Sequence, residues 1–304
     1  MDMKSKIAIV GMGALGVMYG DMIVRSLGQD SLTFLADRDR IDRYKREGVF
    51  CNGRKCEFQI EAEAGEADLL IFAVKGTALK EAMELAAGAV GENTIILSLL
   101  NGISSEEILK QRFGSGHIVY CVAQGMDAVK LGNELTYEHI GELRIGVPEK
   151  EKQYLAEKAA AILKSARIPY VVEEDILHRL WSKWMLNVGV NQVIMVYEGT
   201  YGTIQKPGEA RDTMIAAMEE VIELSGHENT GVTREDMEGY LTLLDSLNPE
   251  GMPSMRQDGL SHRYSEVEMF AGTVIKKAGK YRLEVPVNQM LYRKVKEMEA
   301  SYKR

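Results

Sequence analysis

One segment in the second half of the chain, Leu180–Asn191, combines apolar side chains with a regular row of polar ones. Lys183, Asn187 and Asn191 recur every four residues, so on a helix they lie on one face. Two tryptophans and other apolar neighbours leave little room for a solvated face, and a buried ammonium must be paired or used. A lysine with an ordinary pKa of about 10.4 is protonated at neutral pH, so it can donate a proton to a carbonyl oxygen. The row predicts a proton-donating site; the alternative is a surface row with a snorkelling lysine.

A glycine-rich turn near the N-terminus has the pattern G-x-G-x-x-G, between the apolar stretch Ile7–Val10 and the helical pattern Ala14–Ser26. The first glycine permits a tight turn, the second lets the backbone approach a pyrophosphate, and the third lets helix and strand pack closely. The N-terminus of the helix adds N–H groups for the anion. This context predicts a dinucleotide site; the alternative is a glycine-rich loop that binds nothing. The residues of the turn are Gly11, Met12, Gly13, Ala14, Leu15 and Gly16.

The residues after the second predicted strand give a mixed signal about the dinucleotide. Asp37 lies 21 residues after Gly16, where an acidic residue usually binds the ribose 2′-hydroxyl and repels a 2′-phosphate. Arg38 follows at once and could pair with that phosphate through two hydrogen bonds. Arg40 and Arg43 are expected to belong to the solvated face of the next helix. Both NADP and NAD therefore remain open at this point.

Two further polar residues follow apolar strands. Lys75 comes after Leu69–Ala73, and Asn101 comes after Thr94–Ser98. In open α/β sheets, ligands bind at the carboxyl ends of the strands. Lys75 could therefore reach the cofactor, and Asn101 could hydrogen-bond the nicotinamide ribose or the substrate. Taken singly, such residues are mostly solvated side chains or turn residues, and it is their position at the predicted ligand edge that favours a role in binding.

The first half of the chain alternates short apolar runs with helical patterns, which is typical of βαβ units and a parallel sheet. Two polar stretches separated by Gly141, Glu134–His139 and Glu142–Val147, predict a hairpin. After about Glu173 the strand signal disappears and apolar residues recur at helical spacing. The sequence thus predicts an α/β fold, with a Rossmann-like parallel sheet over residues 1–172 and an all-helical domain over residues 173–304. We expect strands at Ile7–Val10, Leu32–Ala36, Leu69–Ala73, Thr94–Ser98, Ile118–Ala123 and Tyr170–Val172, and helices at Ala14–Ser26, Asp39–Glu47, Ala78–Ala87, Ser105–Phe113 and Lys150–Ser165.

Local signals place two helices near the end of the chain. Ser254 and Gln257 form a capping-box pattern that predicts a helix from Ser254 to about Ala278. Glu266 falls on that helix, where a glutamate is ordinarily solvated. Pro286 is expected to begin the last helix, because proline is well tolerated at the first helical position.

Composition excludes several classes of protein. The 304 residues carry 37 Lys and Arg against 45 Asp and Glu, a net charge of −8, which argues against a general nucleic-acid binder. Three cysteines and five scattered histidines give neither a disulfide framework nor the spacing of a metal site, so we expect no metal and a reducing, cytoplasmic setting. No apolar run approaches the roughly 18 residues that span a bilayer, so no membrane partner is expected.

Taken in order, these motifs resemble the ketopantoate reductase family (2-dehydropantoate 2-reductases) over nearly the whole chain. The resemblance lies in G-M-G-A-L-G, V-K-G after the third strand, L-N-G after the fourth, L-W-x-K-x-x-x-N-x-x-x-N, P-S-M-x-Q-D and S-E-V-E. It implies a Rossmann domain followed by a helical domain, with the active site in the cleft. It also implies NADPH-dependent reduction of 2-dehydropantoate to (R)-pantoate, a step toward pantothenate and coenzyme A, and a homodimer.

The resemblance also implies roles for individual residues. Lys183 would be the catalytic lysine, and Glu266 would contact the hydroxyl groups of cofactor and substrate. Many family members carry an arginine directly after the second strand, whereas this chain has Ala36-Asp37-Arg38. Either Arg38 binds the 2′-phosphate from this shifted position or the enzyme accepts NADH. Substrate contacts would come from Asn101, Asn187, Asn191 and Ser254, and cofactor contacts from Gly11 to Gly16, Lys75, Asn101 and Ala128.

Hydride transfer to a ketone leaves negative charge on oxygen, so such a site needs an acid at that oxygen and donors for the substrate carboxylate. We expect Lys183 to be the general acid, Asn187 and Asn191 to orient it or the substrate, and Ser254 to bind a hydroxyl or carboxylate. Two alternatives stay open: a related NAD(P)-dependent reductase of another 2-keto acid, and a dinucleotide-binding sensor without chemistry. A sensor needs no proton donor, so the polar row counts against it.

Overall fold

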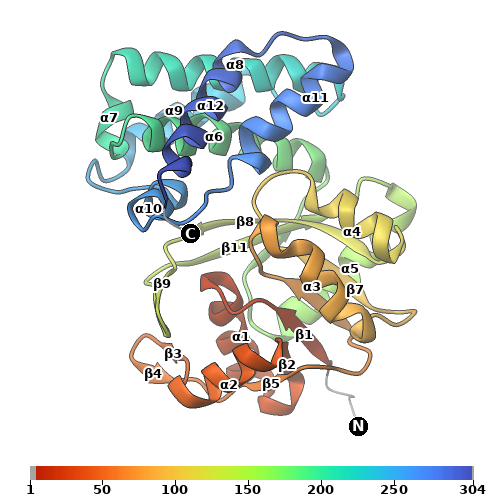
Figure 1. Cartoon of the computed structure of the whole chain (residues 1–304). Coiled ribbons are helices and arrows are strands. Elements are labelled where there is room, and N and C mark those ends of the chain that lie inside the picture. Colours follow the sequence, from red (N-terminus) through yellow and green to blue (C-terminus); the bar gives the residue numbers. More distant parts are fainter. Residues whose placement is uncertain (1–4, 303–304) are drawn as a thin grey trace. The chain divides into compact units, whose positions relative to one another are not determined.

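The computed structural model describes residues 5–302 and divides into two compact units (Figure 1). The first unit comprises the chain up to Asn101 together with Ser105–Ile176. The second comprises Gly102–Ser104 and the chain from Leu177 onward. Each unit is described separately below.

The first unit is built on an eight-stranded sheet with the strand order β12-β11-β8-β7-β6-β1-β2-β5. Six neighbouring strands, from β5 to β8, run parallel, whereas β11 is antiparallel to β8 and β12 is parallel to β11. The central strands are fully buried, which explains why they are continuous apolar runs rather than alternating ones. The strands are β1 (Ile7–Val10), β2 (Leu32–Leu35), β5 (Gln59–Glu61), β6 (Leu69–Phe72), β7 (Ile95–Ser98), β8 (Ile118–Met126), β11 (Ile140–Gly146) and β12 (Tyr170–Val172).

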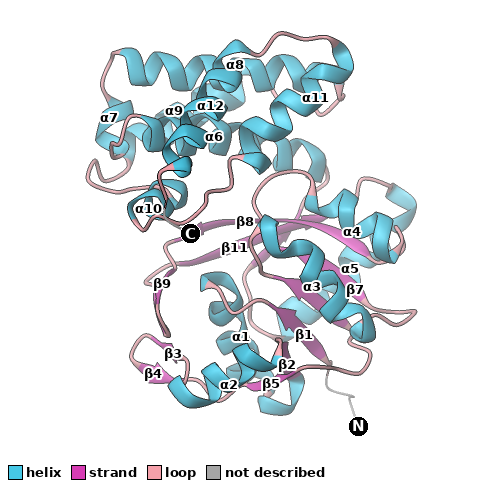
Figure 2. Cartoon of the chain, in the orientation of Figure 1, coloured by secondary structure: helices cyan, strands magenta, loops and turns pink. Residues whose placement is uncertain are grey.

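Helices connect the parallel strands, as the alternating pattern predicts (Figure 2). The predicted strands and helices of this unit are all present, with ends that differ by at most three residues. The helices are α1 (Ala14–Leu27), α2 (Arg38–Glu47), α3 (Leu79–Ala86), α4 (Ser105–Phe113) and α5 (Gln153–Ser165), with short 3-10 turns at Gln29–Ser31, Gly76–Ala78, Ala87–Ala89 and Lys150–Lys152. The prediction of an α/β fold with a parallel sheet is confirmed.

The predicted hairpin around Gly141 is wrong. Gly141 lies inside β11 with a φ of +59°, where the strand crosses Gly125 of β8, and an added Cβ would overlap the Gln124 carbonyl. This glycine therefore serves a close crossing of two strands and not a turn. The strand before it pairs elsewhere, in a second sheet of order β4-β3-β10-β9 that the sequence did not reveal. Its strands are β3 (Phe50–Cys51), β4 (Arg54–Lys55), β9 (Val129–Leu131) and β10 (Glu134–Thr136).

The second unit contains helices and no strand among its described residues, as predicted. Apolar stripes at helical spacing form its interior; Met214, Met218 and Val221 of α8 are fully buried. No described helix is long and apolar enough to cross a membrane. The helices are α6 (Ile176–Val196), α7 (Tyr201–Gln205), α8 (Glu209–His227), α9 (Arg234–Ser246), α10 (Ser254–Leu260), the π-helix η5 (Glu268–Gly272), α11 (Thr273–Tyr281) and α12 (Pro286–Ala300).

The long helix predicted from Ser254 is the second error. Helix α10 ends at Leu260, and an irregular segment follows in which His262 has a φ of +48°. Ser254 is the first helical residue and not the cap, and the cap position is held by Pro253, which offers no side-chain acceptor. Glu266 therefore lies in the turn before η5 and not on the helix that Ser254 opens. Pro286 begins α12, as expected.

Candidate functional site

The glycine-rich turn lies at the point where the sheet changes direction. From β1 the chain runs outward through β2 and β5 on one side, and then returns to β6 on the other side of β1. Gly11 follows β1 with a φ of +105°, and a Cβ at this position would overlap the carbonyl of Ala73, which follows β6. A Cβ at Gly16 would overlap the Gly11 carbonyl. Steric crowding at a topological switch point therefore requires both glycines.

The middle glycine has a different environment. Gly13 is exposed, and the nearest atom to an added Cβ is the Ala73 oxygen at 3.7 Å. Because Gly13 is the N-cap of α1 and has no side chain, no side-chain acceptor covers the first turn of that helix. Open space beside uncapped N–H groups suits a pyrophosphate. Of the remaining turn residues, Met12 is buried, while Ala14 and Leu15 are half-buried against the core.

Both carboxylate oxygens of Asp37 interact with residues of α2, the helix that Asp37 caps. This residue is the N-cap of α2: its Oδ1 accepts the backbone N–H of Arg40 at 2.8 Å, and its Oδ2 lies 3.1 Å from the Arg40 guanidinium. Arg43 is exposed, with its guanidinium carbon 4.9 Å from the centre of the Tyr44 ring. Arg38 is the first residue of α2 and is exposed. At the end of β2, therefore, Asp37 is paired with Arg40 and stands next to an exposed arginine, Arg38.

Three more predicted cofactor residues follow the carboxyl ends of adjacent parallel strands. Lys75 is exposed after β6, Asn101 is half-buried after β7, and Ala128 is half-buried after β8, where it packs against the core. Since β6 and β7 are neighbours in the sheet, Lys75 and Asn101 share the edge at which the glycine-rich turn follows β1, as expected from the sequence. Strand β8 starts opposite the last residues of β7 and continues to Met126, so Ala128 lies farther along the chain than that edge.

The polar row of the second unit lies on α6. Lys183 and Asn187 are half-buried, and Asn191 is 6% exposed. Asn191 Nδ2 donates to Asn187 Oδ1 at 3.3 Å, so the two amides form one unit. The tryptophans beside the row pack edge to face with 5.1 Å between ring centres, and Trp184 Nε1 donates to the Met269 carbonyl. Aromatic packing thus fixes the apolar sides of the helix.

Ser254 joins the same cluster. Its Oγ donates to Asn191 Oδ1 at 3.4 Å, and the backbone N–H of Met255 donates to the same oxygen at 3.3 Å. Asn191 therefore caps the start of α10 from another helix, which is the reason that the capping box does not form. Asp258, farther along α10, is paired with Arg263 at 2.9 Å. Asn187, Asn191 and Ser254 are brought together as a continuous polar group beside Lys183.

The turn that carries Glu266 is anchored by its preceding residue. The backbone N–H and the Oγ of Ser265 both donate to Glu299 Oε1 of α12, at 2.7 and 2.6 Å. Glu299 is only 3% exposed, and Lys296 lies 3.7 Å from its other oxygen. Glu266 itself is half-buried. A buried carboxylate therefore holds the backbone next to a predicted ligand contact.

Two family models match the sequence: ketopantoate reductase PanE/ApbA over residues 7–150, and its C-terminal domain over residues 175–299. The chain belongs to the ketopantoate reductase family. It is 25% identical to a 2-dehydropantoate 2-reductase of Aquifex aeolicus, over 98% of both chains. The structure of a 2-dehydropantoate 2-reductase from Geobacter metallireducens superposes with a TM-score of 0.82 at 26% identity, covering 96% of this chain and 99% of that one. A D-mandelate dehydrogenase bound to NADH and anilino(oxo)acetate gives 0.87 at 22% identity, covering 98% and 99%.

This membership makes the protein an NAD(P)H-dependent oxidoreductase, as the resemblance implied. The sensor without chemistry is therefore not supported. The similarity to the mandelate dehydrogenase concerns the fold alone, because the identity is low.

Some polar residues of this ketopantoate reductase family member were missed in the sequence. Gln192, next to Asn191, is fully buried; its Nε2 donates to Val188 O and Asn288 Oδ1, and its Oε1 accepts the Ala271 N–H of η5. The signal that could have revealed it is a glutamine inside an apolar run. It ties α6 to the π-helix and therefore supports the segment that follows Glu266.

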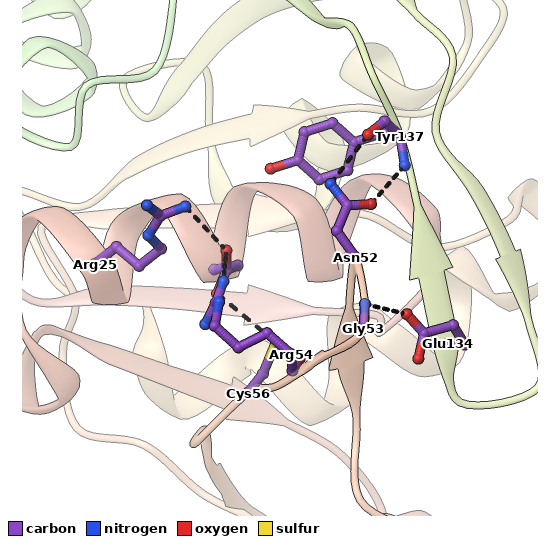
Figure 3. Close-up of polar contacts among 8 residues, drawn as sticks. Arg25, Asn52, Gly53, Arg54, Cys56, Glu134 and Tyr137 are labelled. Carbon is purple, nitrogen blue, oxygen red and sulfur yellow. Dashed lines mark hydrogen bonds and ion pairs between the residues drawn. The ribbon is translucent and has the colours of Figure 1, made fainter.

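A second missed group joins α1 to the β3–β4 hairpin. Asp21 is 2% exposed, and Arg54 donates to both of its oxygens, at 2.7 and 2.6 Å. Figure 3 shows Arg54 and Cys56 on the same stretch of chain, which comprises β4 and the residue after it, with Arg25 approaching from the helix. Burial, followed by the nearby Asp21 charge, raises the pKa of the Cys56 thiol to about 12, so this cysteine is inert at neutral pH.

The structure also contains one arrangement of possible metal ligands among its described residues. Asp127, Glu138 and His139 lie close together and all three are exposed. Asp127 already accepts the backbone N–H groups of Glu138 and His139 and pairs with the His139 ring at 3.0 Å. These contacts tie two loops together and account for the cluster without an ion.

Proposed function

We propose that the protein catalyses the NADPH-dependent reduction of 2-dehydropantoate to (R)-pantoate, a step toward pantothenate and coenzyme A. The observation that carries the proposal is the polar group of the second unit, in which Asn187, Asn191 and Ser254 are joined beside Lys183. Family membership supplies the reaction class. Relatives named 2-dehydropantoate 2-reductase over nearly their whole length support the substrate.

The first unit fits a dinucleotide. The crowded Gly11 and Gly16 shape the turn, while the exposed Gly13 leaves room beside the uncapped start of α1. We assign Gly11 to Gly16, Lys75, Asn101 and Ala128 to cofactor binding. When bound, the dinucleotide supplies the hydride.

We assign Arg38 to the 2′-phosphate. The Asp37 carboxylate, which would repel a phosphate, is paired with Arg40 at 3.1 Å, which offsets part of that repulsion. Arg38 is exposed at the start of the same helix, where the helix dipole also favours an anion. Replacing Arg38 with alanine is therefore expected to raise KM for NADPH more than KM for NADH. Equal effects on both cofactors would refute this assignment.

The second unit supplies the general acid and the polar groups that bind the substrate. The Lys183 ammonium donates its proton to the ketone oxygen of the substrate as negative charge develops there. Asn187 and Asn191 are held in one orientation by their mutual hydrogen bond, and Ser254 adds a hydroxyl to the group. Such fixed polar groups bind a hydroxyl or carboxylate without having to reorganise. Glu266 contacts hydroxyl groups from its anchored turn.

The test is Lys183→Ala. Losing a general acid lowers kcat by roughly 100-fold to 10,000-fold, and we expect a fall in that range for 2-dehydropantoate with NADPH. Lys280→Ala, which removes an exposed lysine of α11, is the matched control and should leave kcat unchanged. Circular dichroism checks that both variants are folded. Turnover of folded Lys183→Ala within a few-fold of wild type would rule out the acid role.

A second candidate is reduction of a different 2-keto acid. The observation that favours it is the similarity of fold to D-mandelate dehydrogenase, which is as strong as that to the 2-dehydropantoate reductase structure. A panel of 2-keto acids, each assayed with NADPH and with NADH, separates the two candidates. The first requires the highest kcat/KM for 2-dehydropantoate, and a preference for an aromatic or unbranched 2-keto acid would favour the second.

A further inference from the structure

A buried chain of hydrogen bonds links helix α4 to the loop that carries Asn101. The backbone N–H of Leu100 donates to Ser98 Oγ at 3.3 Å, Ser98 Oγ donates to Ser105 Oγ at 2.8 Å, and Ser105 Oγ donates to Glu106 Oε2 at 2.9 Å. Each hydroxyl donates once along this chain, which ends on the carboxyl group of Glu106. Ser98, Ser105 and Glu106 are each 1% exposed.

This chain provides a hydrogen bond for only one of the two carboxyl oxygens of Glu106. Its Oε1 is buried without a hydrogen-bond partner among the described residues. Burial raises the pKa of Glu106 from 4.5 to about 7, although its own backbone N–H and Ser105 act in the opposite direction. A carboxyl group with such a pKa carries a proton for much of the time at neutral pH.

The charged and titratable groups around Glu106 do not offset its burial. On α4 itself, Glu107 raises and Lys110 lowers the pKa of Glu106. From β8, Tyr120 faces α4 as a neutral phenol that hydrogen-bonds Lys110 and Glu107. From α3, Glu84 pairs with Arg112 of α4 at 3.4 Å, and both side chains are largely exposed. The first unit thus holds no cation in contact with the buried carboxyl group among these neighbours.

We propose that Glu106 is a positioning residue for Asn101, and that its neutral form holds the Leu99–Ser104 loop in place through Ser105 and Ser98. Leu100 directly precedes Asn101, so the end of the hydrogen-bond chain fixes the backbone next to the proposed ligand contact. When Glu106 loses its proton, a buried carboxylate with one bare oxygen is left. Any opening of the loop that hydrates it then becomes more favourable. Order in the loop therefore decreases as the pH rises.

The size of this effect follows from proton linkage. If Glu106 has a pKa of about 7 in the closed loop and its ordinary value of 4.5 in the open one, the population of the open form rises about tenfold between pH 6 and pH 8. The exchange rate of the Leu100 amide hydrogen reports this opening directly, after correction for the intrinsic pH dependence of exchange. This measurement needs no substrate and does not depend on the proposed function.

The experiment compares wild type with Glu106→Gln, which keeps an acceptor but cannot ionise, and with the control Glu157→Gln, which removes an exposed glutamate of α5 in the same unit. We expect Leu100 protection to fall about tenfold from pH 6 to pH 8 in wild type and in the control, and to be independent of pH in Glu106→Gln. A constant protection in wild type, or an unchanged decrease in Glu106→Gln, overturns the proposal. If Glu106→Gln does not fold, Ser98→Ala takes its place, because it breaks the chain between Leu100 and Glu106: the pH dependence of Leu100 protection should be lost, and an unchanged decrease overturns the proposal.

A kinetic arm connects the loop to catalysis and rests on the proposed function. In wild type, KM for NADPH or for the keto acid should rise with pH in parallel with loop opening, and kcat should change less. In Glu106→Gln, this rise of KM should be absent. A pH-dependent loop without any pH-dependent KM would uphold the positioning of the loop and overturn the binding role of Asn101. Failure of the loop proposal and failure of the proposed function therefore give different results.

Discussion

The pair formed by Asp21 and Arg54 should be a principal anchor of the small sheet on the first unit, and Arg54→Met tests this. Asp21 is 3% exposed at its side chain and Arg54 is 50% exposed. Breaking a fully buried ion pair costs about 3 to 5 kcal/mol, and a surface pair contributes about 0 to 1 kcal/mol. Since one partner is buried and the other half in water, we expect a loss of roughly 2 to 3 kcal/mol. Arg25 lies 3.9 Å from Asp21, so it replaces only part of the interaction that Asp21 loses with Arg54.

The chain offers a convenient way to localise this loss. Both of its tryptophans, Trp181 and Trp184, lie in the helical unit, whereas Asp21 and Arg54 lie in the first unit. Far-ultraviolet circular dichroism during urea unfolding should show the loss of stability for Arg54→Met. Tryptophan fluorescence shows whether the helical unit unfolds in the same transition. In a domain of 150 to 250 residues the corresponding decrease in Tm is roughly 4 to 12 °C.

Two comparisons make the reasoning refutable. Arg46 pairs with Glu47 at 2.8 Å on the surface, with both side chains largely exposed, so Arg46→Met should change stability by less than about 0.5 kcal/mol. The double variant Asp21→Asn, Arg54→Met should be more stable than the sum of the single losses predicts, because the uncompensated charge is removed. If Arg54→Met is as stable as Arg46→Met, the pair does not anchor the sheet.

Three further outcomes are expected. Gly16→Ala should weaken NADPH binding about tenfold or more, because its Cβ would overlap the Gly11 carbonyl; a fluorescence titration with unchanged Kd would contradict the crowding. Glu299→Gln should lower the free energy of unfolding by about 1 to 2 kcal/mol and raise KM, because Ser265 loses its carboxyl acceptor. Thermal unfolding and kinetics identical to those of wild type would refute this. Because the folded pKa of Glu106 is raised to about 7, wild-type stability should fall by up to roughly 3 kcal/mol between pH 4.5 and 7 and then level off. In Glu106→Gln that fall should be absent from urea titrations across the same range, and an identical slope would exclude the buried carboxyl group as its source.

The sequence predicted the large sheet well because its strands are buried on both faces. The runs that form β1 and β6 are apolar throughout, and β7 is apolar up to its last residue, Ser98, as is typical of strands in the middle of a parallel sheet. The small second sheet could not be found in this way. Its strand β4, Arg54–Lys55, is exposed and pairs only with β3 directly before it, and β3 joins the sheet by pairing with β10, far along the chain.

The candidate site shows the same division between local and long-range causes. The four-residue spacing of Lys183, Asn187 and Asn191 predicted one helical face, and α6 is a helix over the whole row. The capping box at Ser254 failed although its local pattern is complete. Asn191, 63 residues earlier, accepts from Ser254 and from the next backbone N–H, and no window around Ser254 contains that information.

Two proposed ligand contacts share a physical design. Asn101 and Glu266 each follow a residue that is hydrogen-bonded to a buried group: Leu100 through Ser98 to the Glu106 chain, and Ser265 directly to Glu299. A side chain on a loop is placed precisely only when its own backbone is restrained, and a buried acceptor next to it provides that restraint. Changes to these buried carboxyl groups should therefore alter KM even though neither group is proposed to touch a ligand. Such changes would be missed by any survey limited to the contact residues themselves.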